Sequence, residues 1–227
     1  MARDIEVQGE TGGKLHVTHL STAGAMKLVK EAKEAGATVT ADVTPHHLLL
    51  TEDAIAENYD GVYKMKPPLR TEEDRQAMIE GIKTGVIDCI ASDHAPHAPG
   101  EKDRGFERAA FGVIGMETSF PVIYDRLVKT GIINLKRLIE LFSTNPAKVL
   151  GLTDRGKVGI GFPADLTLLD LNGDFKIRVE DFHSKSENCP FIGWEGKGTV
   201  AYTIVRGRIV FSLNSLTGRL RPQDVKF

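Results

Sequence analysis

A short β-rich segment that runs into a loop with histidine occurs three times in the first hundred residues, and this arrangement constrains the fold most. The three segments are residues 14–20, 37–43 and 86–90. Between them, apolar residues recur at helical spacing, and Gly36 and Gly85 are natural ends for two helices. Repeated strand–helix units are typical of a parallel sheet with helical crossovers. The sequence therefore predicts an α/β fold in which polar groups gather where the strands end.

The chain changes in character near residue 156. Before it, Thr71 and Asp74 resemble a capping box at the start of a helix. Three further helices are expected there: residues 2–8, residues 117–129, and one that begins near Asn134. A short last helix is expected with Asn145 as its N-cap and Pro146 at its first position. After it, the sequence favours strands over residues 164–170, 199–205 and 208–211. We therefore predict two parts, residues 1–155 and a small β-rich appendage of residues 156–227.

Composition excludes several classes of protein. A net charge of −2, without a block of Lys and Arg, argues against nucleic acid or an anionic membrane as a partner. No apolar run approaches the roughly 20 residues of a membrane span, and the N-terminus does not resemble a signal peptide. Cys89 and Cys189 form no CxxC motif, and Cys89 lies in an apolar segment typical of a buried, reduced thiol. These features indicate a soluble, cytoplasmic protein.

Asp93 is the strongest candidate for chemistry. It follows the apolar residues 86–90, where a carboxylate is costly to desolvate unless a cation or hydrogen-bond donors compensate it. It could bind a divalent metal and accept a proton from metal-bound water, or it could cap the following turn. His97 lies four residues further on, in a loop stiffened by Pro96 and Pro99, and could reach an anionic substrate.

The other histidines leave alternatives open. His19 ends the first β-rich segment and is either a metal ligand or a hydrogen-bonded rim residue, whereas His16 should alternate to the other side of the strand and be packed. His46 and His47 open the loop after the second segment. Because adjacent residues of an extended chain point in opposite directions, at most one should face a pocket. Lys64, Lys66 and Arg70 surround a diproline, which favours a solvated basic loop over one that grips an acidic substrate.

The run Ser92-Asp93-x-Ala95-Pro96-His97, followed by four residues and Lys102, resembles the signature of dihydroorotases, the zinc amidohydrolases of pyrimidine biosynthesis. Further stretches resemble the bacterial type I branch of this family, namely residues 17–22, 43–48, 67–70, 111–118, 145–147 and 163–166. The resemblance covers nearly the whole chain.

The resemblance implies that the three segments are strands six to eight of a (β/α)8 barrel of the TIM type. It implies that His19 and Asp93 bind Zn²⁺, that Asp93 is also the general acid and base, and that His97, Phe111 and Gly112 bind the substrate. Lys66 stands where this branch has an asparagine that touches substrate. The implied reaction is the reversible cyclisation of N-carbamoyl-L-aspartate to dihydroorotate.

Length adds an expectation about completeness. A whole barrel takes about 250 residues, and the family's His-x-His pair does not occur in this chain. A catalytic zinc has three protein ligands, but the resemblance names only two here. We therefore expect a C-terminal portion of the enzyme that alone binds zinc weakly and turns over little substrate. Self-association, an N-terminal portion and aspartate transcarbamoylase are the candidate protein partners.

Two other functions remain open. One is another cyclic amidohydrolase, such as a dihydropyrimidinase or an allantoinase. The other is a non-catalytic, dihydroorotase-like subunit, although such a scaffold would have no physical need for His19, Asp93 and His97 together.

Overall fold

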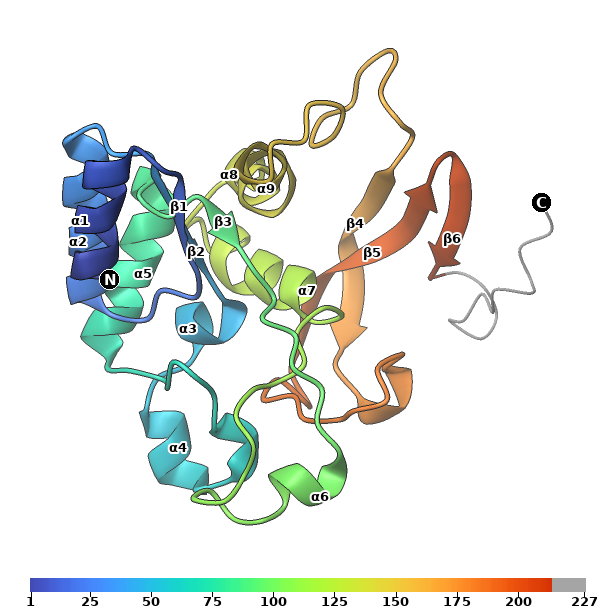
Figure 1. The fold of residues 1–227 in the computed structure, drawn as a ribbon. Coiled ribbons are helices and arrows are strands. Elements are labelled where there is room, and N and C mark those ends of the chain that lie inside the picture. The colour runs from blue at the N-terminus through green and yellow to red at the C-terminus, as the bar shows by residue number, and fades with distance from the viewer. Residues whose placement is uncertain (214–227) are drawn as a thin grey trace.

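The computed structural model describes residues 1–213, which form two sheets with helices between and around them (Figure 1). The first sheet is parallel, in the order β1 (Leu15–Val17), β2 (Val39–Val43) and β3 (Cys89–Ile90). The second is antiparallel, in the order β4 (Leu166–Lys176), β5 (Glu195–Val205) and β6 (Arg208–Ser212). The predicted α/β class and the β-rich end are therefore confirmed. The boundary at residue 156 stays a prediction, and residues 214–227 of that part lie outside the described residues.

Helices α1 (Ala2–Thr11), α2 (Ala23–Glu34) and α5 (Glu72–Thr84) accompany the parallel sheet. The hydroxyl of Thr22 caps α2 by accepting from the N–H of Ala25, and that of Thr71 caps α5 by accepting from the N–H of Asp74. The Asp74 carboxylate does not complete a capping box but accepts from the N–H of Ala23 at 2.8 Å. It thereby ties the start of α2 to the start of α5.

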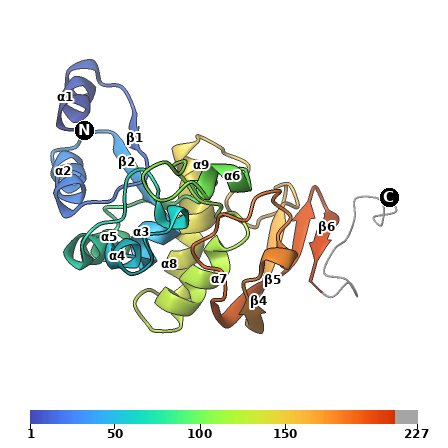
Figure 2. The same ribbon diagram turned by 90° about the horizontal axis from the view of Figure 1, so that it is seen from below.

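Helices α7, α8 and α9 lie between the two sheets in both views (Figures 1 and 2). α7 (Ser119–Ile123) continues into a π-helical turn, and α8 (Leu135–Ile139) continues through residues 140–144 into α9 (Asn145–Val149). The expected separate helix capped by Asn145 is wrong, because Asn145 lies inside a continuous helical segment and its side chain donates to Asp88 O at 2.9 Å. The π-helical stretch accommodates Pro146, which has no backbone N–H to donate.

The segment after β2 also differs from expectation, because it forms α3 (Pro45–Leu49) and not an extended loop. Thr44 caps this helix and Pro45 occupies its first turn. His46 and His47 are consequently both buried, with ring centroids 4.6 Å apart, and the rule for extended chains does not apply. Short helices α4 (Asp53–Asn58) and α6 (Pro99–Lys102) and 3-10 turns at Gly61–Tyr63 and Val179–Asp181 complete the helical elements of the described part.

One apolar cluster joins the two sheets through the helices between them. Its buried members include Val29, Ile82, Leu138 and Phe191, which come from elements far apart in the sequence. Cys89 and Cys189 are buried and unpaired, as predicted for Cys89. Within residues 1–213, no helix has the length and apolar character that crossing a membrane requires.

Truncation of Ile82 tests the importance of this cluster. Ile82 is fully buried, so Ile82→Ala should lower the free energy of unfolding by about 2–5 kcal/mol, measured by urea denaturation. The matched control is Ile160→Ala, because Ile160 is fully exposed and its truncation should change stability by less than about 0.5 kcal/mol. Equal losses for the two variants would contradict the placement of Ile82 in the core.

Burial of His47 predicts a pH-dependent stability. Its Nε2 donates to Pro67 O at 3.0 Å and its Nδ1 accepts from the Thr44 hydroxyl at 2.8 Å, while burial lowers its pKa to about 4. In the unfolded chain His47 becomes protonated as the pH falls below about 6.5, whereas in the folded protein it stays neutral until about pH 4. The free energy of unfolding should therefore fall as the pH is lowered through this window.

Urea denaturation at several pH values measures this effect. His47→Gln should flatten the fall in stability between pH 6.5 and 4. A slope that His47→Gln does not alter would show that His47 titrates alike in both states.

Candidate functional site

The three parallel strands place their carboxyl ends at one edge of the sheet. His19 lies two residues beyond β1, and Asp93 lies three residues beyond β3. Both have a positive φ, 41° at His19 and 46° at Asp93. Non-glycine residues rarely adopt this conformation, and such strain concentrates at functional sites. Among residues 1–213, Tyr59 and Arg206 are the other non-glycine residues with a positive φ, so both residues that the resemblance names as metal ligands belong to a set of four.

Asp42, in β2, holds the strained turn at His19. Its Oδ1 accepts from the His19 backbone N–H at 2.7 Å, and its Oδ2 accepts from His16 Nε2 at 2.9 Å. His16 Nδ1 in turn accepts from the Thr40 hydroxyl at 2.7 Å. The expectation that His16 is packed and hydrogen-bonded is confirmed, and His16 and His19 are not one site. The sequence reasoning missed Asp42, although a carboxylate inside an apolar strand was an available signal.

Three side chains near this edge have polar atoms without a partner. His19 Nδ1 and His46 Nε2 are buried and make no hydrogen bond within residues 1–213. The Asp93 carboxylate likewise has no hydrogen bond or ion pair among the described residues. Burial lowers the pKa of His46 well below its usual value, and His47 and His19 add to the lowering, so His46 is a neutral imidazole at neutral pH. Buried polar groups are normally satisfied, so these atoms are available to a ligand.

The donor types fit zinc, which binds imidazole nitrogen and carboxylate oxygen in proteins. However, the described part of the chain contains no group of three or more potential metal ligands. His19 and Asp93 therefore meet the chemical requirement of a zinc site and not its number of ligands.

His97, Phe111, Gly112 and Lys66 lie close together, although they come from separate loops. His97 Nε2 donates to Phe111 O at 2.8 Å, and Lys66 Nζ lies 6.0 Å from the centre of the Phe111 ring. Gly112 has a φ of 115°, and a Cβ there would lie 2.5 Å from Ala95 Cβ and 3.6 Å from His97 Nε2. Only glycine allows this approach of the two loops.

In the Phe111 loop (residues 110–112) the backbone hydrogen-bonding groups other than the Phe111 N–H have partners within residues 1–213. The Gly112 N–H donates to Lys64 O at 3.0 Å, and Gly112 O accepts from Lys102 and Asn188. The Phe111 N–H has no partner within residues 1–213, and Phe111 is 53% exposed. This N–H, and the exposed ammonium of Lys66 at 6.0 Å from the centre of the Phe111 ring, are donors suited to a carboxylate.

The basic loop is only partly solvated. Lys66 is exposed, as that interpretation requires, but Lys64 donates to Glu107 O at 2.7 Å and lies over the Phe111 ring. The guanidinium Nε of Arg70 is buried without a partner among the described residues. Lys64 and Arg70 therefore depart from the expected solvated loop.

His94 and Asn188 join the loops that carry these residues. His94 Nδ1 accepts from the Gly115 N–H at 3.2 Å. Asn188 donates to Ala95 O at 2.9 Å and accepts from the His97 N–H at 3.3 Å. No local pattern of residues identifies Asn188, because it reaches the site from a distant segment.

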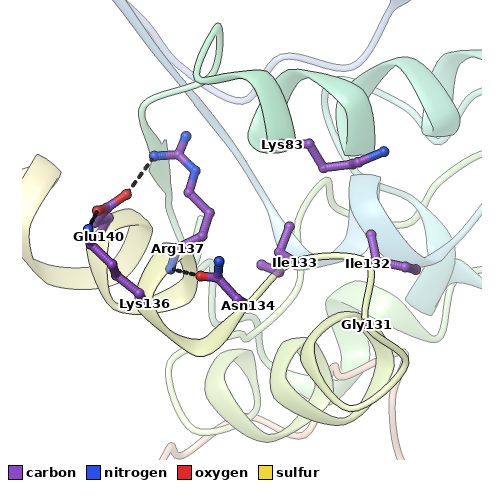
Figure 3. Close-up of a pocket in the computed structure, with 8 residues that line it drawn as sticks. All are labelled: Lys83, Gly131, Ile132, Ile133, Asn134, Lys136, Arg137 and Glu140. Carbon is purple, nitrogen blue, oxygen red and sulfur yellow. Dashed lines mark hydrogen bonds and ion pairs between the residues drawn. The ribbon is translucent and has the colours of Figure 1, made fainter.

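A hollow of about 500 Å³ lies elsewhere, between the end of α5 and the start of α8 (Figure 3). Arg137, in its wall, donates to Ile82 O at 2.7 Å, to Ile87 O at 2.9 Å and to Glu140 at 3.3 Å. These bonds are at the amino end of β3, opposite the edge that holds Asp93. Because Arg137 is engaged structurally and the hollow lies away from His19 and Asp93, the hollow is not the candidate active site.

Comparisons with known proteins identify the family of this chain. Residues 3–210 match the Amidohydrolase family. The dihydroorotase of Brevibacillus brevis is 47% identical over 211 residues, which cover 93% of this chain and 49% of the relative. The dihydroorotase of Caldanaerobacter subterraneus subsp. tengcongensis is 45% identical over 214 residues, again 49% of its length. The chain spans about half the length of the curated relatives it matches.

Solved structures with the same fold carry other names. An L-hydantoinase (dihydropyrimidinase) from Arthrobacter aurescens superposes with a TM-score of 0.86 and 33% identity, covering 92% of this chain and 47% of that one. A D-hydantoinase (dihydropyrimidinase) from Thermus sp. has a TM-score of 0.88 and 26% identity, covering 97% and 48%. Since the family match extends over nearly all of its length, this chain belongs to the amidohydrolase family.

Proposed function

We propose that this chain carries the acid–base and substrate-binding part of a dihydroorotase, which interconverts N-carbamoyl-L-aspartate and dihydroorotate. One observation carries the proposal: His97 joins the Asp93 loop to the Phe111 loop, next to Lys66, in a chain 47% identical to a dihydroorotase. On this proposal the parallel sheet corresponds to strands six to eight of a (β/α)8 barrel, and residues 156–227 form the appendage.

His19 and Asp93 would hold a zinc ion, and the unpartnered His19 Nδ1 and Asp93 carboxylate support this assignment. When bound, zinc would polarise the ring carbonyl and lower the pKa of the attacking water. Asp93 accepts the proton of that water as its oxygen adds to the ring carbonyl carbon. Asp93 then delivers the proton to the ring nitrogen as the C–N bond breaks, and the reverse steps close the ring.

The substrate carboxylate would lie against Lys66, His97 and the Phe111 N–H. His97 Nε2 donates to Phe111 O, and its Nδ1 lies 3.5 Å from a Glu101 carboxylate oxygen. To donate to the substrate carboxylate, Nδ1 would carry a proton and exchange Glu101 for the substrate. Lys66, which stands where the family has an asparagine, adds a positive charge at a site that would bind an acidic substrate.

The remaining zinc ligands would come from a further segment, because the relatives are about twice as long as this chain. That segment is the protein partner we propose, ahead of self-association and of aspartate transcarbamoylase. Strand β1 lies at one edge of the parallel sheet, so its outer side offers backbone groups with which a strand of that segment could pair.

A hydantoinase or dihydropyrimidinase is the second candidate, and the solved structures favour it. Hydantoin lacks a carboxylate, whereas the free donors near Phe111 are suited to one. A non-catalytic subunit is disfavoured, since a scaffold would gain nothing from strained backbone at His19 and Asp93 or from a buried His19 Nδ1 without a partner among the described residues.

The test is a fused protein in which the N-terminal half of the Brevibacillus brevis relative precedes this chain. We expect it to bind zinc and to hydrolyse dihydroorotate in preference to hydantoin, and the unfused chain to do so weakly. Asp93→Asn should lower kcat by about 10²-fold or more. The matched control, Asp154→Asn, changes an exposed carboxylate and should leave kcat unaltered.

Each outcome has a meaning. Faster turnover of hydantoin than of dihydroorotate would favour the second candidate. Full activity of Asp93→Asn, with native circular dichroism, would refute its role as acid and base.

A further inference from the structure

The proposed reaction gives no task to Lys102, although its side chain is only 6% exposed. Lys102 ends α6, and its ammonium donates to Lys64 O at 3.2 Å, Ala110 O at 2.8 Å and Gly112 O at 2.9 Å. An ammonium has three N–H donors, so these bonds occupy all of them. Lys102 is therefore fixed in place and is not a free amine.

Two of the three carbonyls flank Phe111. In a trans peptide unit the C=O and the N–H point in opposite directions. Because Ala110 O points at Lys102, the N–H of Phe111, which belongs to the same peptide unit, points away from Lys102. Lys102 thus sets the direction of the unpartnered N–H that the site offers to a ligand.

The charge of Lys102 also strengthens this donor. A hydrogen bond from a cation to a carbonyl polarises the peptide unit, and the N–H at its other end becomes a better donor. Two hydrogen bonds, from Lys102 and Asn188 at 2.9 and 3.1 Å, fix Gly112 O in the next peptide unit. Phe111 is therefore held on both sides.

Burial of this cation is costly. It lowers the pKa of Lys102 to about 8, while Asp60 opposes the lowering and Lys64 adds to it. An apolar side chain could fill the same space without desolvating a charge. A buried charge at Lys102 is therefore consistent with a role other than packing.

We propose that Lys102 is a positioning residue that orients and polarises the Phe111 N–H as a hydrogen-bond donor to the carboxylate of an acidic cyclic amide. This inference rests on the proposed dihydroorotase function and names one donor by which that site selects its substrate class.

Steady-state kinetics of the fused protein test the functional part. Lys102→Met keeps the length of the side chain and removes the cation and its donors. It should raise KM for dihydroorotate at least about tenfold, the loss expected for one hydrogen bond to a charged group, and leave kcat within about threefold. Lys27→Met, on the exposed face of α2, is the matched control and should change neither constant. An unchanged KM in folded Lys102→Met would overturn the proposal.

Hydrogen exchange supplies a test that does not need activity. In the 227-residue chain itself, Lys102→Met should speed amide exchange in residues 108–114 and leave residues 77–83 of α5 unchanged. Unaltered exchange in residues 108–114 would overturn the inference, even if the fused protein proved inactive and the proposed function failed.

The unmutated fused protein provides a third measurement, which can be made even if the Lys102→Met variant does not fold. Dihydroorotate should protect the Phe111 amide from exchange, whereas 5,6-dihydrouracil, which lacks the carboxylate, should not. Equal protection by both compounds, or by neither, would overturn the proposal.

Discussion

The parallel strands of this protein are very short, and buried polar side chains therefore hold the loops that follow them in place. β1 and β3 have three and two residues, so their ladders fix little of the chain beyond the strand ends. Asp42 holds the turn at His19, and Lys102 holds the loop around Phe111, each through backbone groups. Loss of one partner of such a buried hydrogen bond costs about 1–3 kcal/mol, because the other partner is left unsatisfied. The geometry of the candidate site therefore depends on side chains that need not touch a substrate.

The same dependence explains where the backbone is strained. A positive φ at His19 and Asp93 is unfavourable for residues with a Cβ, and it persists only when the surroundings compensate it. At His19 the compensation is the 2.7 Å bond from its N–H to Asp42. After Asp93 the chain is held instead by a hydrogen bond that the Ala95 N–H donates to Val113 O at 2.9 Å. Stable contacts next to each residue thus support a conformation that the residue alone would not adopt.

Local signals predicted the fold better than they predicted the site. The cap at Thr71 and the end of α5 at Gly85 depend on neighbouring residues, and both were predicted. The helix at Pro45–Leu49 was missed although Thr44 and Pro45 form an N-terminal capping pattern. For the site, the run from Asp93 to Lys102 named the residues, but the bonds of Asn188 span more than 90 positions of sequence. No periodicity or spacing carries such long-range information, and the resemblance to a family supplied the chemistry.

Substrate choice in this family must lie in the loops, because the fold does not discriminate. Proteins named hydantoinase superpose on this chain with TM-scores of 0.86 and 0.88 at 33% and 26% identity, and one fold can host different specificities. The Phe111 loop differs from a neutral pocket in its surroundings: the ammonium groups of Lys64 and Lys66 lie 4.7 and 6.0 Å from the Phe111 ring, and that of Lys102 lies beneath its backbone. These three ammonium groups and the Phe111 N–H favour an anion over a neutral ring, and the carboxylates of Glu101, beside His97, and Asp60, near Lys102, oppose them. This electrostatic preference, more than the shape of the sheet, is the physical reason to expect an acidic substrate.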